Sequence, residues 1–218
     1  MKKMNIIYED KEILVVNKEA KKLTIATQKE QERTLYHEAR EYVKKQYPKN
    51  KIFIVHRLDK DTSGLVLFAK NEQKKISLQN NWSNVKREYY AVVEGKMPKK
   101  KDVLKSYLVE TKTLQVYSTK DKNIGKLAIT EYEVLAETKA YSLLKINIKT
   151  GRKNQIRVAL SDIGHPIIGD KKYGSKTNFL RRLALHAYLI EYKNSKDNKT
   201  YHFETPCPKE FERMFKNI

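Results

Sequence analysis

Short apolar runs and short apolar alternations recur along this chain, and they predict several strands in succession with helices interspersed. The stretch from Ile6 to Val16 is predicted as strands broken near Glu9 and Asp10. Further strands are predicted at Ile52–Val55, Leu65–Ala69, Tyr89–Val93 and Leu144–Ile148. This order is typical of an α+β fold with a mixed, mainly antiparallel central sheet flanked by helices and loops.

Helices are predicted at Arg33–Gln46, Asn71–Trp82 and Pro208–Phe215. The first has the clearest pattern, because Thr34 can cap it and Pro48 follows its end. The length of 218 residues indicates one domain, and we expect residues 1–218 to form a single catalytic unit.

The segment beginning at Gln155 alternates in the manner of a strand. Ile156, Val158 and Leu160 would share one face, and Gln155 and Arg157 the other. If the polar side faces a cleft, Arg157 could pair with a carboxylate and hold it ionised. Taken without context, the pattern is better explained by an ordinary exposed arginine on a half-buried strand.

A polar loop lies between two of the predicted strands. It reads His56-Arg57-Leu58-Asp59-Lys60-Asp61-Thr62-Ser63-Gly64. A rigid scaffold that presents a polar loop is a common way to position catalytic groups. The same residue types also suit a solvated turn, and the pattern alone favours neither interpretation.

Glycine is scarce in this chain, and four of the seven glycines fall within 24 residues: Gly151, Gly164, Gly169 and Gly174. This concentration predicts tight turns or close backbone approach there.

Lysine and arginine number 46 and aspartate and glutamate 26, so the formal charge is 46 − 26 = +20. Such a surplus favours a polyanionic partner, because each neutralised phosphate releases counterions. A general preference for lysine explains part of it, and charge alone does not separate RNA, DNA and anionic membrane.

Several other classes of site are disfavoured by the sequence. The five histidines include no close metal-binding pair, and Cys207 is the single cysteine, so we expect no metal site and no disulfide. Neither a phosphate-binding glycine loop nor the setting of a serine nucleophile is present. No apolar run could span a bilayer and no signal-peptide core is visible, so we expect a cytoplasmic protein.

Taken together, the motifs resemble the RluA-type family of RNA pseudouridine synthases. The similarity runs from about residue 6 to residue 208 and keeps the motifs in order. The matching segments are His56-Arg57-Leu58-Asp59 with Asp61 to Gly64; Arg87, Tyr89, Ala91 and Gly95; Gly125-Lys126, Ala128 and Thr130; Thr150 to Arg152 with Gln155 to Arg157; Gly164, Pro166, Gly169-Asp170 and Tyr173-Gly174; and Leu185-His186-Ala187.

The resemblance implies an isomerase that detaches uracil from C1′ of a uridine in ribosomal or transfer RNA, rotates it and reattaches it through C5. It implies a catalytic domain without an accessory N-terminal RNA-binding domain, an active site in a central cleft and no cofactor. We expect a monomer with no obligate protein partner.

The resemblance also implies the catalytic residues. Asp59 would be the nucleophile, Arg157 would keep it ionised, and Tyr89 would stack on the base. Addition at uracil and attack at the sugar both remain open as routes. Asp61 is the rival carboxylate, and Asp59 is preferred because it matches the family's nucleophile.

Further residues are implied to bind the substrate. Because the uridine must leave its stack to react, Arg57 would fill the gap left behind. Leu185 would form part of an apolar wall. The remaining expected substrate-binding residues are His56, Leu58, Thr62, Gly64 and Ile156.

The chain departs from the family pattern at flanking positions: Glu19 and Lys21 stand where the family has proline and glycine, Lys153-Asn154 where it has Thr-His, and Ala159 where it has histidine. These positions concern substrate contacts more than chemistry. A catalytically silent, basic RNA-binding or ribosome-assembly protein of the same fold is the alternative hypothesis.

Overall fold

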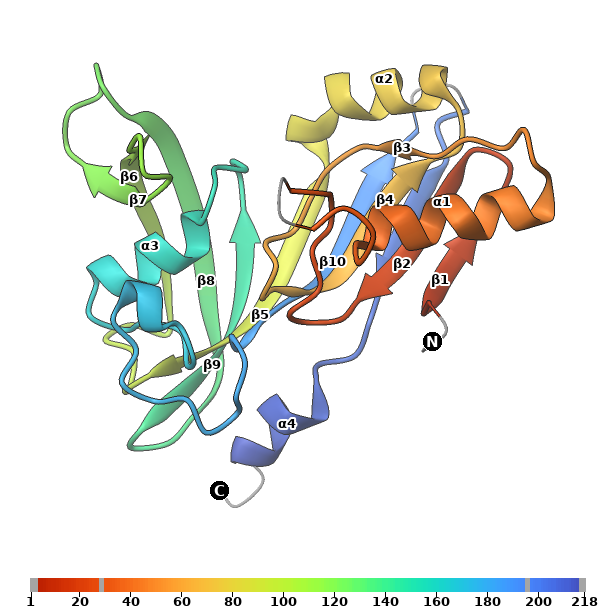
Figure 1. Cartoon of the computed structure of the whole chain (residues 1–218). Coiled ribbons are helices and arrows are strands. Elements are labelled where there is room, and N and C mark those ends of the chain that lie inside the picture. Colours follow the sequence, from red (N-terminus) through yellow and green to blue (C-terminus); the bar gives the residue numbers. More distant parts are fainter. Residues whose placement is uncertain (1–3, 28–29, 195–196, 216–218) are drawn as a thin grey trace. The chain divides into compact units, whose positions relative to one another are not determined.

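The computed structural model describes residues 4–27, 30–194 and 197–215, and the chain divides into two compact units (Figure 1). Unit 1 contains the residues up to Val85 together with Leu189–Thr205. Unit 2 contains Lys86–Tyr188 and the residues from Pro206 onward. Strand β10 (Leu185–Lys193) begins in unit 2 and ends in unit 1.

Unit 1 is built on antiparallel strands, as predicted. Its strands are β1 (Ile6–Glu9), β2 (Ile13–Lys18), the short β3 (Phe53–Ile54), β4 (Ser63–Ala69) and β11 (Thr200–Glu204), which pairs with the end of β10. The predicted break near Glu9 and Asp10 is confirmed. The Asp10 carboxylate accepts hydrogen bonds of 2.7 Å from the backbone N–H groups of Glu12 and Ile13, which stabilises the turn between β1 and β2.

Strand β4 is buried along its whole length, which confirms the prediction from its uninterrupted apolar run. Both faces are covered by helices. On one face Leu65 and Leu67 pack with Leu78 of helix α2 (Glu72–Asn80). On the other, the Phe68 ring lies 6.4 Å from the Tyr36 ring of helix α1 (Leu35–Gln46). A strand covered on both faces needs apolar residues at consecutive positions.

Helix α1 ends at Gln46 as predicted and begins at Leu35, two residues after the predicted start at Arg33 and directly after the predicted cap Thr34. The Thr34 hydroxyl accepts a 3.1 Å hydrogen bond from the His37 backbone N–H, which caps the first turn. Helix α2 is capped in the same way by Asn71, and it ends two residues before the predicted boundary at Trp82.

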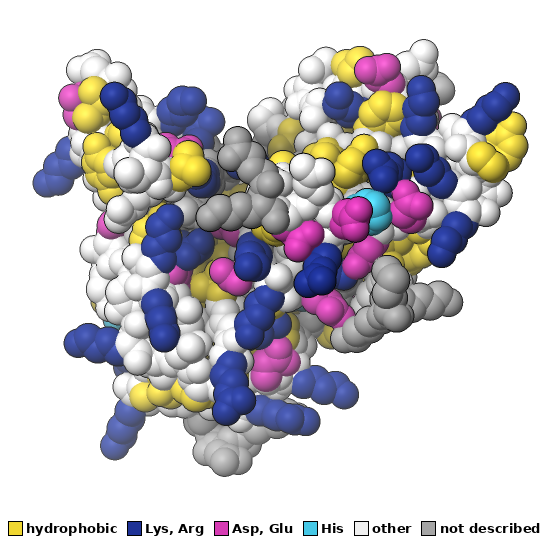
Figure 2. All heavy atoms as spheres, in the orientation of Figure 1, with side chains coloured by type: hydrophobic (Ala, Val, Ile, Leu, Met, Phe, Trp, Pro, Cys, Tyr) yellow, Lys and Arg dark blue, Asp and Glu magenta, His cyan; other side chains and the backbone are white. Residues whose placement is uncertain are grey.

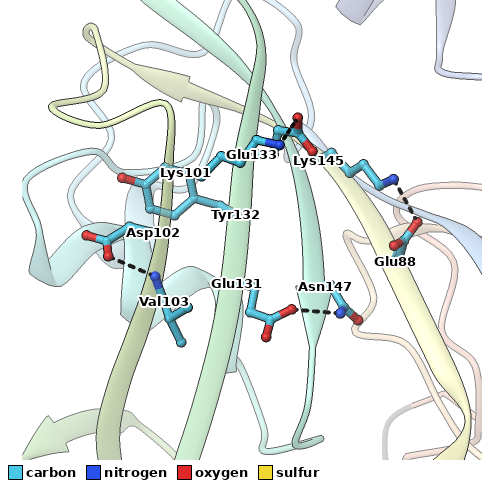
Figure 3. Close-up of a pocket in the computed structure, with 9 residues that line it drawn as sticks. All are labelled: Glu88, Lys101, Asp102, Val103, Glu131, Tyr132, Glu133, Lys145 and Asn147. Carbon is cyan, nitrogen blue, oxygen red and sulfur yellow. Dashed lines mark hydrogen bonds and ion pairs between the residues drawn. The ribbon is translucent and has the colours of Figure 1, made fainter.

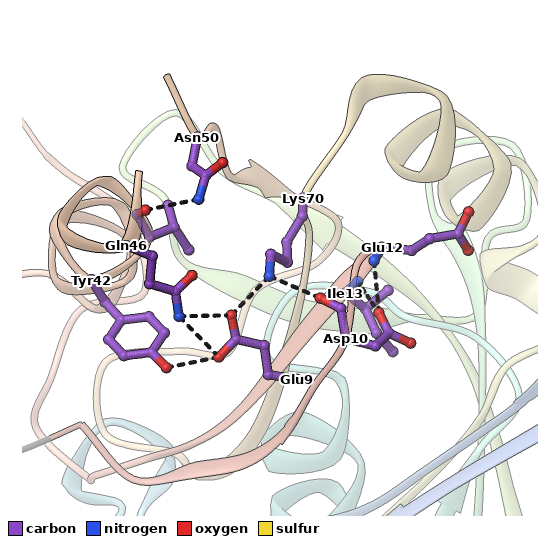
Figure 4. Close-up of polar contacts among 9 residues, drawn as sticks. Glu9, Asp10, Glu12, Ile13, Tyr42, Gln46, Asn50 and Lys70 are labelled. Atoms are coloured by element: carbon purple, nitrogen blue, oxygen red, sulfur yellow. Dashed lines mark hydrogen bonds and ion pairs between the residues drawn. The ribbon is translucent and has the colours of Figure 1, made fainter. Parts of the chain in front are cut away.

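A carboxylate on β1 fastens α1 to the sheet (Figure 4). Glu9 accepts hydrogen bonds from the Tyr42 hydroxyl at 2.7 Å, the Gln46 amide at 3.1 Å and the Lys70 ammonium at 2.8 Å. Burial alone would raise the pKa of Glu9, but the bonds from Lys70, Tyr42 and Gln46 outweigh it and lower that pKa. The residue is therefore held as an anion between helix and sheet.

Unit 2 is an antiparallel sheet with one helix packed on it (Figure 1). In spatial order its strands are β5 (Lys86–Glu94), β9 (Tyr141–Ile148), β8 (Lys126–Glu137), β6 (Lys101–Glu110) and β7 (Val116–Thr119). The strands predicted at Tyr89–Val93 and Leu144–Ile148 are confirmed within β5 and β9. Helix α3 (Gln155–Asp162) buries Ile156 and Leu160 in the same hydrophobic core as Ile146.

The remaining helical segments of the described residues are short. They are helix α4 (Lys209–Glu212) and the 3-10 turns Trp82–Asn84, Lys171–Tyr173 and Arg213–Phe215. The helix predicted at Pro208–Phe215 is thus present as one α turn followed by a 3-10 turn.

The strand predicted from Gln155 is wrong, because this segment is helix α3. Gln155, Ile156 and Ala159 are all buried in it, although a strand would have placed Gln155 opposite Ile156. Ile156, Ala159 and Leu160 stand at i, i+3 and i+4, so the run fits a helix as well as a strand. Packing against the sheet of unit 2 decided between the two periods.

The glycine-rich stretch forms turns, as predicted. Gly164, Gly169 and Gly174 all have positive φ angles, near +80° to +92°. At Gly169 a β-carbon would lie 2.1 Å from the Arg182 carbonyl oxygen, so the two backbones approach at a distance that only glycine permits.

Candidate active site

The loop between β3 and β4 carries Asp59, and its backbone is tied on the side of Leu58. The Thr24 hydroxyl donates a 2.7 Å hydrogen bond to the Leu58 carbonyl oxygen and accepts a 3.2 Å bond from the Leu58 N–H. Thr24 is 2% exposed and Leu58 is 7% exposed, so water does not readily replace these bonds. One buried hydroxyl thus satisfies both polar groups of the residue before Asp59.

A buried lysine ties the backbone on the other side of Asp59. The Lys18 ammonium donates hydrogen bonds to the carbonyl oxygens of Lys60 at 3.0 Å, Lys22 at 2.7 Å and Glu19 at 3.0 Å. Lys18 is 1% exposed. Its charge is matched by these carbonyl dipoles, as a buried cation requires, and the residue after Asp59 is fixed to the turn after β2.

The two ends of the loop are fixed as well. His56 accepts a 3.0 Å hydrogen bond from the Leu67 N–H through Nε2, and its ring stacks on Trp82 with centroids 4.5 Å apart. At the other end the Thr62 N–H donates to the Asp59 carbonyl oxygen at 3.2 Å. Gly64 has a φ of +117°, a conformation that side-chain-bearing residues rarely adopt.

The loop residues differ in solvent exposure, and this difference separates the side chains that pack inside the protein from those that face solvent. Leu58 and Thr62 are buried, Asp59 is half-buried, and Arg57 and Asp61 are exposed. Asp59 is therefore the carboxylate with a restrained backbone on either side, whereas Asp61 extends into solvent. Of the expected substrate-binding residues, His56, Leu58 and Thr62 support the loop in this structure.

Unit 2 holds the remaining predicted site residues. Tyr89 lies on β5 opposite Ile146 of β9 and is half-buried. Ile156 and Leu185 are both buried in the core of this unit. A β-carbon at Gly151 would lie 2.7 Å from the Arg87 guanidinium, so the end of the Arg87 side chain lies close to the backbone at Gly151.

Arg157 is restrained from several directions. Its Nε and Nη2 atoms each donate a 2.7 Å hydrogen bond to Asp170, which is 2% exposed. Its Nη1 atom donates to the Asn154 side-chain oxygen at 3.2 Å, and the guanidinium lies 4.8 Å from the centre of the Tyr173 ring. Burial raises the pKa of Tyr173 above its ordinary value, so its ring stays neutral.

The predicted residues thus form two groups. Asp59 is assembled in unit 1 with Thr24 and Lys18, whereas Tyr89 and Arg157 belong to unit 2. The ion pair expected between Asp59 and Arg157 would join the two units, and it stays a prediction. Sequence reasoning missed Thr24, which carries no motif signal, and gave Asp170 no role although it lies in a matched motif.

A pocket of about 510 Å³ lies on the strands of unit 2 (Figure 3), and none of the predicted site residues lines it. Four of its charged side chains form ion pairs with one another: Lys101 contacts Glu133 at 2.8 Å and Lys145 contacts Glu88 at 3.5 Å. Pairs of this kind are typical of a solvated sheet surface, and we do not assign the pocket to catalysis.

Runs of neighbouring basic residues, such as Lys99-Lys100-Lys101 and Arg181-Arg182, are candidates for contact with RNA phosphates, and their charges are not equally available. Lys99, Lys100 and Lys101 each pair with an acidic side chain, at 3.0, 2.7 and 2.8 Å. Arg182 is largely buried and donates to Glu210. Figure 2 shows lysine and arginine side chains spread across the visible surface among acidic ones, so the charge is distributed over this face.

Neither a metal site nor a membrane span is found among residues 4–27, 30–194 and 197–215. No group of three or more His, Cys, Asp or Glu side chains there is placed to hold a metal ion. No helix in the same ranges is long and apolar enough to cross a membrane.

Comparison with known proteins identifies the family. Residues 12–162 match the family model described as RNA pseudouridylate synthase. The chain is 33% identical, over 99% of its own length and 73% of the relative's, to a Bacillus subtilis protein named uncharacterized RNA pseudouridine synthase YlyB. It is 35% identical, over 94% of its length and 64% of the relative's, to ribosomal large subunit pseudouridine synthase D of Buchnera aphidicola.

The fold is shared with a solved structure, human RNA pseudouridylate synthase domain containing 4. The TM-score is 0.80 at 21% identity, over 95% of this chain and 90% of that one. This likeness confirms the predicted α+β pseudouridine synthase fold. Family match, curated relatives and fold agree, and the chain belongs to the RluA-type family of RNA pseudouridine synthases, which are isomerases acting on RNA.

Proposed function

We propose that this chain converts specific uridines of ribosomal or transfer RNA to pseudouridine, with Asp59 as the catalytic nucleophile. The observation that carries the proposal is the restrained loop. Asp59 is half-buried, and the backbone on either side of it is fixed by the Thr24 hydroxyl and the Lys18 ammonium. A nucleophile held in one orientation avoids much of the entropic cost of reaching the reacting atom.

The proposed mechanism gives each remaining residue one task. The target uridine leaves its stack and enters the pocket, and the exposed Arg57 side chain fills the gap. Tyr89 stacks on the base and Arg157 favours the ionised form of Asp59. Leu185 and Ile156 contribute to an apolar wall. Addition at uracil and attack at the sugar both use the same carboxylate.

The RNA class is proposed from a relative. The Buchnera protein is named for the large ribosomal subunit, so ribosomal RNA is the first substrate to test and transfer RNA the second. We further propose that both units form one catalytic domain, since the family match at residues 12–162 includes parts of each. The enzyme would act as a monomer in the cytoplasm.

The test is release of tritium from RNA labelled at C5 of uridine, because forming the new bond at C5 expels that hydrogen. Wild type should release tritium, and Asp59→Asn should release none while keeping its circular dichroism spectrum. Asp61→Asn is the matched control, since it removes an exposed carboxylate two residues away. Release by Asp59→Asn would contradict the assignment.

The same assay addresses the alternative of a catalytically silent RNA-binding protein. Binding of ribosomal and transfer RNA by wild type, without tritium release from either pool or from ribosome assembly intermediates, would favour that alternative.

A further inference from the structure

We infer that Asp170 is a positioning residue, which orients the Arg157 guanidinium for reaction and acts only through it. The inference rests on the proposed catalytic role of Arg157. Asp170 itself touches neither the proposed nucleophile nor the base in this scheme. Its effect would be exerted through the two parallel hydrogen bonds of 2.7 Å that it accepts from Arg157.

The geometry of this ion pair fixes the orientation of the Arg157 guanidinium and does not merely attract it. Two oxygens facing Nε and Nη2 fix the plane of the guanidinium, which a single contact would leave free to rotate. Asp170 is 2% exposed and the Arg157 side chain 12% exposed, so water competes poorly for either partner. Charged hydrogen bonds in such surroundings are stronger than on an open surface.

Asn154 and Tyr173 complete the restraint. The Asn154 side-chain oxygen accepts from Nη1 of Arg157 at 3.2 Å, and its amide nitrogen donates to the Tyr173 hydroxyl at 2.9 Å. That hydroxyl donates to the Val116 carbonyl oxygen at 3.2 Å, which ties the Tyr173 ring beside the guanidinium to strand β7. Asn154 has a φ of +53°, a conformation that asparagine tolerates better than most residues.

This arrangement also changes how Arg157 would act electrostatically. A guanidinium already paired with a buried carboxylate contributes little net charge at a distance. Its contribution to the ionised nucleophile would then come from directed N–H donors in a fixed orientation, which is the form of stabilisation that preorganised sites use. The orientation set by Asp170 is what makes those donors useful.

The experiment is a double-mutant cycle on single-turnover rates measured by tritium release with enzyme in excess. Asp170→Asn should lower the rate constant roughly 10- to 100-fold, with RNA affinity changed less than about threefold. In the Arg157→Ala background, Asp170→Asn should have almost no further effect, because its only path of action is gone. Glu210→Gln, which removes the Arg182 ion pair in the same unit, is the control and should leave the rate unchanged.

An equal loss from Asp170→Asn in both backgrounds would overturn the inference and indicate a general structural role. Unchanged activity in Arg157→Ala would instead contradict the proposed role of Arg157, and activity in Asp59→Asn would contradict the proposed function. The experiment therefore distinguishes failure of the inference from failure of either proposal on which it rests. If Asp170→Asn does not fold, the cycle is run with Asp170→Glu, which keeps the carboxylate but displaces it by one methylene group from the two Arg157 donors. Its loss should be smaller and should vanish without Arg157; a loss that persists would overturn the inference.

Discussion

The hydroxyl of Thr24 offers the sharpest test of how the catalytic loop is held. Thr24→Val keeps the size and branching of the side chain but removes the oxygen that bonds both polar groups of Leu58. No cavity is created, so the effect reports the loss of hydrogen bonds rather than of packing. The Leu58 N–H and C=O are left without this partner in a site where Thr24 is 2% exposed.

The magnitude follows from those two groups. Leaving one buried donor or acceptor unsatisfied costs about 1–3 kcal/mol, so two such groups predict a loss of about 2–4 kcal/mol when partial relaxation is allowed. A loop that relaxes to recover water contacts also displaces Asp59, the next residue. A displacement of about 1 Å costs roughly 100-fold in rate, so the rate constant should fall at least 10-fold.

The assay pairs Thr24→Val with Thr24→Ser. Serine keeps the hydroxyl and loses one methyl group, which predicts a loss of only about 1 kcal/mol and near-normal tritium release. Urea unfolding gives the stabilities and single-turnover tritium release gives the rates. If the valine variant matches the serine variant in both measurements, the hydroxyl does not position the loop and the reasoning is refuted.

Two further predictions follow from the backbone and from a buried histidine. Lys21 has a φ of +67°, and glycine stands at this position in the family pattern. Lys21→Gly should therefore stabilise the protein by about 0.5–1 kcal/mol in thermal unfolding. The control Ala20→Gly should destabilise the protein, and a loss of stability in Lys21→Gly would contradict the prediction. Burial, and then the Arg182 charge, lower the pKa of His186 to about 4. In the unfolded protein His186 therefore binds a proton below about pH 6.5, whereas in the folded protein it binds one only around pH 4. The free energy of unfolding should fall by about 2 kcal/mol between pH 7 and pH 5. His186→Gln should lack this fall in urea unfolding, and a variant with the same pH dependence as the wild type would contradict the prediction.

Local patterns in the sequence predicted helix α1 and the strands β1 to β5 and β9, but they did not predict β6, β7, β8, β10 or β11. The uninterrupted apolar run of β4 reports directly on a strand covered on both faces, and Thr34 marks the start of α1 because capping is a local interaction. The failure at α3 has an equally local cause. Ile156, Val158, Ala159 and Leu160 contain both an i, i+2, i+4 set and an i, i+3, i+4 set, so the short pattern fits either period and only contacts with the sheet of unit 2 distinguish them.

For the candidate site too, the sequence indicated some residues and not others. Asp59, Tyr89 and Arg157 were predicted from a family resemblance, and their roles stay proposals. The groups that hold them were out of reach, because Thr24 is 34 residues from Leu58 and Lys18 is 42 residues from Lys60 in sequence. A threonine or lysine far away in the chain gives no pattern that marks it as a partner of a loop backbone.

The stack of His56 on Trp82 has a practical consequence. Trp82 is the single tryptophan of the chain, against 14 tyrosines, so excitation at the red edge of the absorption band reports on this residue alone. A stacked imidazole quenches indole emission, most strongly when it is protonated. Because His56 begins the loop that carries Asp59, the intensity of this intrinsic fluorophore follows the base of the loop without any label, and stopped-flow mixing with RNA can time its movement against tritium release.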